Sequence, residues 1–199
     1  MANEMRTFVT VKSEDKRVAE KLRELFTPSE GKYETTALDI INRIKGTNYC
    51  YKDERENWDR DVDFPDNDTW EELIGPKWMN VEYDHQELPE NCNIVLSSAW
   101  SVPIPFLETL NQILIEIDED CYIKGTYEDE SYDPCGAFIY GNGYDDIEDY
   151  DDEFDWDAYD EDGFYLENFH EELLQLERDI EMAYFEYLSD RKANPQDYE

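Results

Sequence analysis

Residues 6–26, RTFVTVKSEDKRVAEKLRELF, contain a strand signal followed directly by a helix signal. The segment RTFVTVK is rich in β-branched and aromatic side chains, which favour a strand. Ser13 is expected to cap the helix, with Glu14 and Asp15 in its first turn, where the helix dipole favours anions. The apolar residues that follow have the spacing of one helix face: Val18, Leu22, Leu25 and Phe26. This stretch therefore predicts a strand and an amphipathic helix, which ends before Pro28.

Further strand and helix signals continue to residue 140. Thr36 and Asp39 resemble a capping box for a second helix over 35–45. Pro103 and Pro105 open a longer helix, because proline is tolerated in a first helical turn. The other predicted elements are a helical turn from residue 69 stopped at Gly75, strands at 77–84 and 92–98, and a hairpin of 121–127 with 136–140. This order predicts an α+β fold, one antiparallel sheet with helices on one face.

Two tryptophan-containing runs, WEELIGPKW and SSAWSVPIP, resemble the signatures of the YubB-type ferredoxin-like family of plasmid and bacteriophage proteins. The matching residues are Gly75, Lys77, Trp78, Ala99, Trp100, Ser101 and Pro103, and CGAFIYG resembles the closing strand of that family. Ile74, Pro76 and Val102 depart from the family pattern. The resemblance implies a ferredoxin-like fold over roughly residues 5–143 and a mobile-element origin, but no catalytic residue. We expect Trp78 and Trp100 to be core and cap-packing residues and Lys77 to lie on the surface.

The net charge of −36 is unevenly distributed along the chain. Residues 1–60 carry twelve acids and twelve bases, whereas residues 125–177 carry twenty acids and no base. The aromatic content of 15% argues for folding despite this repulsion. Such anion density disfavours direct binding to nucleic acid or to an anionic membrane, so we expect a basic protein partner. The opening residues lack the apolar region of a signal peptide, which predicts a cytoplasmic protein, in the host cell if a phage encodes it.

Residues 144–165, YDDIEDYDDEFDWDAYDEDGFY, interleave twelve carboxylates with eight large apolar or aromatic residues. If this segment were helical, it would span about 33 Å, and its charge would approach that of the roughly ten phosphates of one DNA strand. An extended chain would dilute the charge about twofold. The predicted partner-binding residues are Asp145, Asp146, Glu148, Asp149, Asp151, Asp152, Glu153, Asp155, Asp157 and Asp160, with Phe154 and Trp156.

Two functions fit this acidic-aromatic segment. The first is a bacteriophage or mobile-element DNA mimic that inhibits a host DNA-binding or restriction-type defence protein. The alternative is a protein-interaction module or adaptor, which docks on a basic partner by coupled folding of the segment. Order separates the two readings, because a mimic must hold its charges in a fixed array.

Leu166, Phe169, Leu173, Leu176, Ile180, Ala183 and Tyr187 follow one another at alternating intervals of three and four residues. This seven-residue repeat predicts a long C-terminal helix with a narrow apolar seam. The seam either docks on the protein's own sheet or forms a homodimer through residues 166–188. Acids on the helix, Glu171, Glu172, Glu177 and Glu181, are expected on its outer face. The predicted organisation is a domain over 1–143, an acidic segment over 144–165 and a helix over 166–190.

The sequence predicts no enzyme, no cofactor and no metal site. The four cysteines are far apart and form no CxxC pair, which makes a zinc site weak. A calcium loop with Gly163 at its sixth position would place Ala158 at the first and Phe169 at the twelfth, so the motif fails. The carboxylates are too many and too local to single out an acid–base pair.

Overall fold

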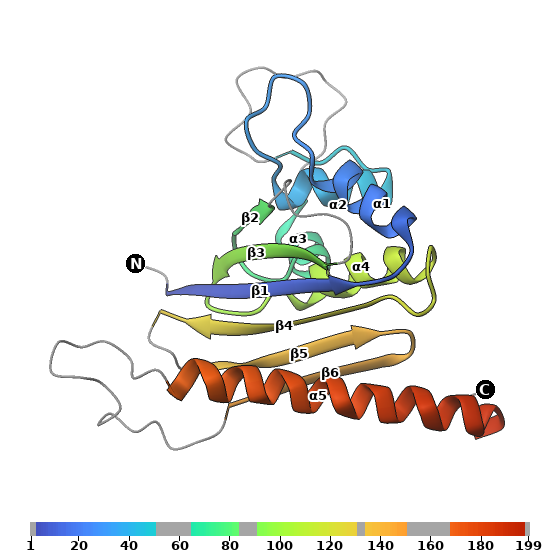
Figure 1. The fold of residues 1–199 in the computed structure, drawn as a ribbon. Coiled ribbons are helices and arrows are strands. Elements are labelled where there is room, and N and C mark those ends of the chain that lie inside the picture. The colour runs from blue at the N-terminus through green and yellow to red at the C-terminus, as the bar shows by residue number, and fades with distance from the viewer. Residues whose placement is uncertain (1–2, 51–64, 84–90, 131–133, 151–167, 198–199) are drawn as a thin grey trace, which may run out of the picture.

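The computed structural model describes residues 3–50, 65–83, 91–130, 134–150 and 168–197 of the 199-residue chain. The helices are α1 (Lys16–Phe26), α2 (Ala37–Lys45), α3 (Asn67–Leu73), α4 (Ile104–Ile115) and α5 (Asn168–Ala193), with a short 3₁₀ helix η3 (Pro195–Asp197). The strands are β1 (Glu4–Lys12), β2 (Met79–Tyr83), β3 (Asn91–Ala99), β4 (Tyr122–Asp129), β5 (Cys135–Gly141) and β6 (Tyr144–Asp149). The fold is α+β, as the sequence predicts (Figure 1).

The six strands form one antiparallel sheet in the order β2-β3-β1-β4-β5-β6. The first predicted strand, β1, is central and pairs with both β3 and β4. The predicted hairpin of β4 with β5 is also present, with Ile123 opposite Tyr140. The sheet then continues through β6, so the expected boundary after residue 143 falls in the turn between two paired strands.

Helices α1, α2 and α4 cover one face of the sheet and enclose the main core. Alternate residues of β1 point into it, including Met5, Val9 and Val11. The helices add Leu22 and Leu25 from α1 and other fully buried residues, namely Ile40, Ile41, Phe106, Leu107 and Leu110. This apolar burial stabilises the fold against the repulsion of its own charge.

The caps of the first two helices differ in how well the sequence predicts them. Thr36 and Asp39 form the expected capping box, in which Asp39 N–H donates to Thr36 Oγ1 and Thr36 N–H donates to Asp39. The Ser13 prediction is wrong, because Asp15 is the N-cap of α1 and accepts from the Arg17 backbone N–H. Ser13 Oγ instead accepts from Asp15 N–H and donates to Asp118, which links the β1–α1 turn to the turn after α4.

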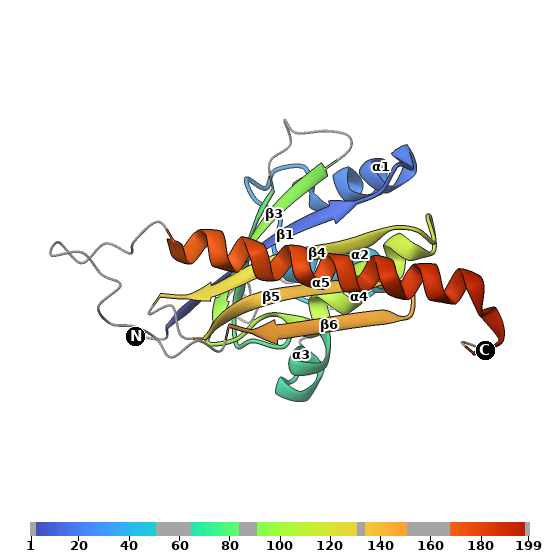
Figure 2. The same cartoon turned by 60° about the horizontal axis from the view of Figure 1, so that its bottom comes forward.

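Helix α5 packs on the opposite face of the sheet, over β4, β5 and β6 (Figure 2). Ile180 and Tyr184 pack on Ala137 and Ile139 of β5, whose side chains point away from the main core. The predicted apolar seam of the helix therefore docks on the chain's own sheet. The structure corrects one seam position, because Ala183 is exposed and Tyr184 is fully buried. Leu166 lies outside the described residues.

A close approach between Gly141 and Tyr184 fixes how α5 docks. A Cβ atom added at Gly141 would lie 2.4 Å from the Tyr184 hydroxyl oxygen and 2.5 Å from two ring carbons. Glycine therefore leaves the space that the tyrosine ring occupies. Gly143, with φ of 74°, completes the β5–β6 turn in the left-handed conformation that glycine adopts readily.

The two tryptophans of the family-like signatures are not buried. Trp78 is partly exposed, and Trp100 is 54% exposed with φ of 61°. The expectation that they are core and cap-packing residues is therefore wrong in its first part, since neither lies in the core. Lys77 is exposed as predicted, and its Nζ lies 6.0 Å from the ring centroid of Trp100. The pair forms a surface cation–π contact.

Candidate functional site

The described part of the predicted acidic segment is the edge strand β6 (Tyr144–Asp149). Of the helical and extended arrangements considered for the segment, these six residues adopt the extended one and pair with β5, with Ile147 opposite Phe138. Asp146 and Glu148 lie on the α5 face of the sheet, and Asp145 and Asp149 lie on the face of the main core. The other predicted site residues lie outside the described residues: Asp151, Asp152, Glu153, Phe154, Asp155, Trp156, Asp157 and Asp160.

Helix α5 adds a second row of carboxylates beside β6. Glu172, Asp179, Glu186 and Asp190 are all exposed and recur at i, i+7, i+14 and i+18, which places them on one side of the helix. The contacts of α5 identify this side. The hydroxyl of Tyr150, the residue after β6, donates to Glu172, whereas the opposite side of the helix contacts Lys124 on β4. The four carboxylates therefore lie on the β6 side of α5.

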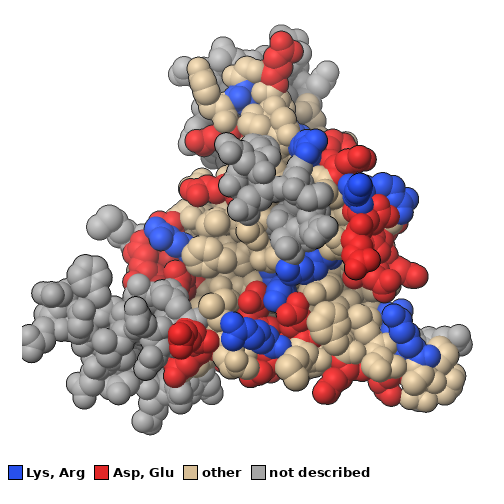
Figure 3. Space-filling model, in the orientation of Figure 1, with Lys and Arg blue, Asp and Glu red and all other residues tan. Residues whose placement is uncertain are grey.

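We call these two rows together the acidic surface: Asp145, Asp146, Glu148 and Asp149 of β6 with Glu172, Asp179, Glu186 and Asp190 of α5. Two arginines of α5 lie near these rows: Arg191 donates to Asn142 O in the β5–β6 turn, and Arg178 donates to Gln175, which in turn donates to Asp179. Figure 3 shows acidic side chains projecting along the margin where α5 lies, with neutral and basic side chains between the acidic groups on the viewed face. The surface is thus ordered, but it is not one unbroken patch in this view.

Two tyrosine hydroxyls fix carboxylates of the acidic surface. Tyr127 on β4 donates to Asp149, and Tyr150 donates to Glu172. Burial of the Tyr127 ring, together with its bond to Asp149, raises the pKa of its phenol well above the usual value. Tyr127 therefore stays a neutral donor, and Asp149 is held as a hydrogen-bond acceptor.

Acids on the other side of α5 have a structural role. Lys124 Nζ lies 2.8 Å from Glu181 Oε2 and 3.7 Å from Glu177 Oε1. Burial raises the pKa of Glu181, but hydrogen bonds from Lys124 and Tyr122 outweigh it and lower that pKa overall. Glu177 and Glu181 are thus partly buried partners of β4 and do not contribute to the outer face, contrary to the prediction.

Glu171 and Glu172 are exposed, as predicted. Asp179, Glu186 and Asp190 were not singled out from the sequence. The signal that could have found them is their spacing, because Glu172, Asp179 and Glu186 repeat every seven residues beside the apolar seam. A heptad pattern places such residues on one flank of the helix.

In the described ranges, no group of three or more His, Cys, Asp or Glu side chains could hold a metal ion. None of the described helices combines the length and apolarity needed to cross a bilayer. Comparison with protein families, with curated proteins and with solved structures gave no match.

Proposed function

We propose that this protein is a non-enzymatic inhibitor that imitates the polyanionic surface of DNA and blocks a host DNA-binding or restriction-type defence protein. The observation that carries the proposal is the acidic surface, in which eight carboxylates stand on a paired strand and a docked helix. A mimic needs charges in fixed positions, and these two elements supply them.

The carboxylates of β6 match a DNA strand in number, but they are divided between two faces of the sheet. From Asp145 to Asp149 the strand spans about 14 Å, a length over which a DNA strand presents about four phosphates. Over this length β6 carries four carboxylates, two on each face. From Glu172 to Asp190, α5 spans about 27 Å, over which a DNA strand presents about eight phosphates. The four acids on α5 supply half of that charge.

We also infer a ferredoxin-like core and a phage or plasmid origin, with the cytoplasm of the host cell as the place of action. The β1-α1-β2-β3-α4-β4 progression supports the inferred core, with α2 and α3 inserted after α1 and the strands ordered β2-β3-β1-β4. The origin rests on the resemblance of the two tryptophan-containing runs. In this arrangement, β5, β6 and α5 extend the core on the β4 side and carry the acidic surface.

Competition with duplex DNA tests the proposed function. A panel of basic bacterial DNA-binding proteins, including restriction endonucleases, is bound to a labelled duplex, and the protein is added at increasing concentration. We expect it to displace the duplex from at least one target, with an affinity that falls steeply as salt rises. If the protein binds one or more of these targets but displaces the duplex from none of them, mimicry is contradicted.

Matched variants show whether the acidic surface is responsible. The test variant neutralises the four acids of β6 as Asp145→Asn, Asp146→Asn, Glu148→Gln and Asp149→Asn. The control neutralises four exposed acids elsewhere, as Glu20→Gln, Glu71→Gln, Glu72→Gln and Glu119→Gln. Both variants change the net charge equally. We expect about a tenfold loss of competition in the test variant, since each exposed ion pair contributes about 0.2–1 kcal/mol, and a smaller loss in the control.

The interaction-module alternative predicts a different pattern. In that case Phe154→Ala and Trp156→Ala dominate the loss, because buried aromatic anchors usually carry interface energy. Duplex DNA then need not compete. Neutralising Asp149, Asp151, Asp152, Asp155 and Asp157 together would have little effect under the alternative and a large effect under mimicry.

A further inference from the structure

The second edge of the sheet, strand β2, differs from β6. Met79, Val81 and Tyr83 point to the main-core face, and Asn80 and Glu82 point to the opposite face. The edge therefore alternates apolar and polar side chains. It carries one acid in five residues, whereas β6 carries four in six.

The backbone of β2 has hydrogen-bonding groups that face away from the sheet. Ala99 N–H of β3 donates to the carbonyl oxygen of Trp78, the residue before β2. Trp78 and Ala99 therefore form a hydrogen-bonded pair of the antiparallel ladder. Pairs alternate along an antiparallel ladder, which makes Asn80 and Glu82 the next residues bonded to β3. The N–H and C=O groups of Met79 and Val81 consequently point outward, and the described residues supply no neighbouring strand for them.

A groove of about 720 Å³ runs beside these outward groups. One wall is β2 with Trp78, and the other is the end of α1 and the loop that leads to α2, which lies above the β2 edge (Figure 1). Phe26 and Tyr83 form its aromatic floor, with ring centroids 5.0 Å apart. Tyr33 stands fully exposed in the loop wall.

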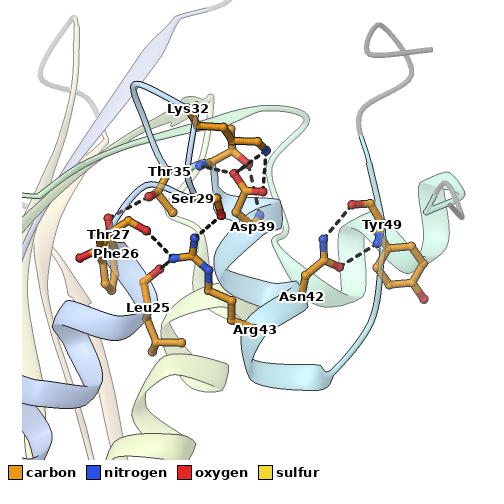
Figure 4. A network of polar contacts seen from close by, with 11 residues as sticks. Leu25, Phe26, Thr27, Ser29, Lys32, Thr35, Asp39, Asn42, Arg43 and Tyr49 are labelled. Carbon is orange, nitrogen blue, oxygen red and sulfur yellow. Dashed lines mark hydrogen bonds and ion pairs between the residues drawn. The ribbon is translucent and has the colours of Figure 1, made fainter. Parts of the chain in front are cut away.

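Hydrogen bonds hold the loop wall in place (Figure 4). The Arg43 guanidinium donates to the carbonyl oxygens of Glu24, Leu25 and Thr27 and to Ser29 Oγ. The buried Thr35 hydroxyl donates to Phe26 O at 2.8 Å, which closes the loop onto the end of α1. The groove is therefore preformed, and binding a ligand requires little ordering of this wall.

The charge of the groove is negative and uncompensated. Glu34 and Glu82 line it, and neither carboxylate has an ion-pair partner among the described residues. The nearby cations have other contacts, since Lys32 Nζ lies 2.9 Å from Asp39 and Lys77 lies over the Trp100 ring. A ligand with positive charge fits this groove better than a neutral or acidic one.

We propose that the β2 edge and its groove bind an extended peptide, in which basic residues alternate with apolar ones, as a seventh strand of the sheet. Outward N–H and C=O groups of Met79 and Val81 would pair with the peptide backbone. Its apolar side chains would then lie on the face of Phe26 and Tyr83, and its basic side chains on the face of Glu82. This surface lies at the opposite edge of the sheet from β6, so it is a second interface that does not depend on DNA mimicry.

The test uses a fluorescent, end-capped peptide with the order Lys-Val-Lys-Tyr-Lys-Val-Lys and the intact protein at physiological salt. A control peptide of the same composition carries N-methyl groups on alternate residues, which remove backbone donors. We expect the control peptide to bind at least about tenfold more weakly, because it loses several backbone hydrogen bonds. We also expect the amides of Met79 and Val81 to exchange more slowly when the unmodified peptide is bound.

Paired charge variants distinguish binding in the groove from non-specific attraction of the basic peptide to this acidic protein. Glu34→Gln with Glu82→Gln is expected to weaken peptide binding about fivefold. Glu71→Gln with Glu72→Gln removes the same charge from α3 and is expected to have little effect. The four-acid β6 variant, which tests the mimic, should also leave peptide affinity within about twofold. Equal losses in all three variants, or equal binding of the N-methylated peptide, would overturn the proposal.

Discussion

Lys124 on β4 and Glu181 on α5 form an ion pair of 2.8 Å that joins the helix to the sheet. Both side chains are largely buried, with 11% and 20% exposure, and Tyr122 donates a further hydrogen bond to Glu181. The pair faces away from β6. It fixes the rotation of α5 about its axis, and it thereby fixes which acids of the helix stand beside the strand.

Replacing Glu181 by Gln should lower the free energy of unfolding by about 2 kcal/mol near neutral pH, the magnitude of a hydrogen bond between charged groups. The folded-state pKa of Glu181 lies below its ordinary value of 4.5. Its contribution is therefore complete above pH 4.5 and is lost as the pH falls through the folded pKa. Urea denaturation at several pH values measures this difference. Glu186→Gln, at an exposed position, is the control, and an equal pH-dependent loss there would contradict the assignment.

Gly141→Ala should destabilise the protein by about 1–3 kcal/mol, because the added methyl group overlaps the Tyr184 ring. Thermal unfolding measures the effect. In the background of Tyr184→Leu the same glycine change should cost much less, which a double-mutant cycle detects. Equal costs in both backgrounds would show that the ring does not occupy this space.

Alkaline titration should reveal the buried tyrosines. Burial is the main cause that raises the pKa of the Tyr184 phenol, from 10.0 to about 12. Neutral Tyr184 therefore stabilises the fold fully below pH 10, and this contribution is lost as the pH rises through about 12. Tyrosinate absorbance should show a late phase that coincides with unfolding. Tyr184→Phe is the control, because it should reduce the amplitude of this late phase.

Neutralising the four acids of β6 should raise the stability of the monomer or leave it unchanged, since like-charge repulsion falls. The same change removes the charges that guard an edge strand. We therefore expect self-association to increase, as measured by light scattering over a range of protein concentrations. The α5 set, namely Glu172→Gln, Asp179→Asn, Glu186→Gln and Asp190→Asn, removes equal charge away from the edge. The α5 variant should self-associate less than the β6 variant.

A homodimer through α5 stays a prediction, and the docked seam constrains it. Leu173, Ile180 and Tyr184 are buried against the sheet, whereas Leu174, Met182 and Phe185 are exposed. Any such dimer should use these exposed residues. Phe185→Ser should then dissociate it, whereas Ala193→Ser should not, as size-exclusion chromatography with light scattering would show. A dimer that survives Phe185→Ser would place the contact elsewhere.

The sequence was most informative where local signals agreed with tertiary packing. The β1–α1 unit and the Thr36 capping box combine a clear pattern with a buried face, and both were predicted. Strand β6 was missed because aspartate disfavours strands, and its Gly-Asn-Gly turn at 141–143 was the overlooked signal. The seam prediction failed at Ala183 because a straight helix drifts by about 20° per heptad from a seven-residue repeat, which brings Tyr184 to the sheet.

The candidate site was less predictable than the fold. A sequence shows where carboxylates cluster. It does not show which of them lie on the outer surface and which make structural contacts within the fold. Lys124 lies more than fifty residues from Glu177 and Glu181, and only the docking of α5 makes them neighbours. The row from Glu172 to Asp190 likewise acquires its position from the packing of Tyr184 on β5.

The unequal edges of the sheet also limit how copies of this chain can assemble. A strand bearing four carboxylates in six residues repels a second acidic edge, so β6 cannot accept the β6 of another copy without neutralisation. Two copies joined through their β2 edges would present β6 at both ends of the combined sheet. A third copy could not then add to either end through its own β6. The carboxylates of β6 therefore oppose extension of such a pair.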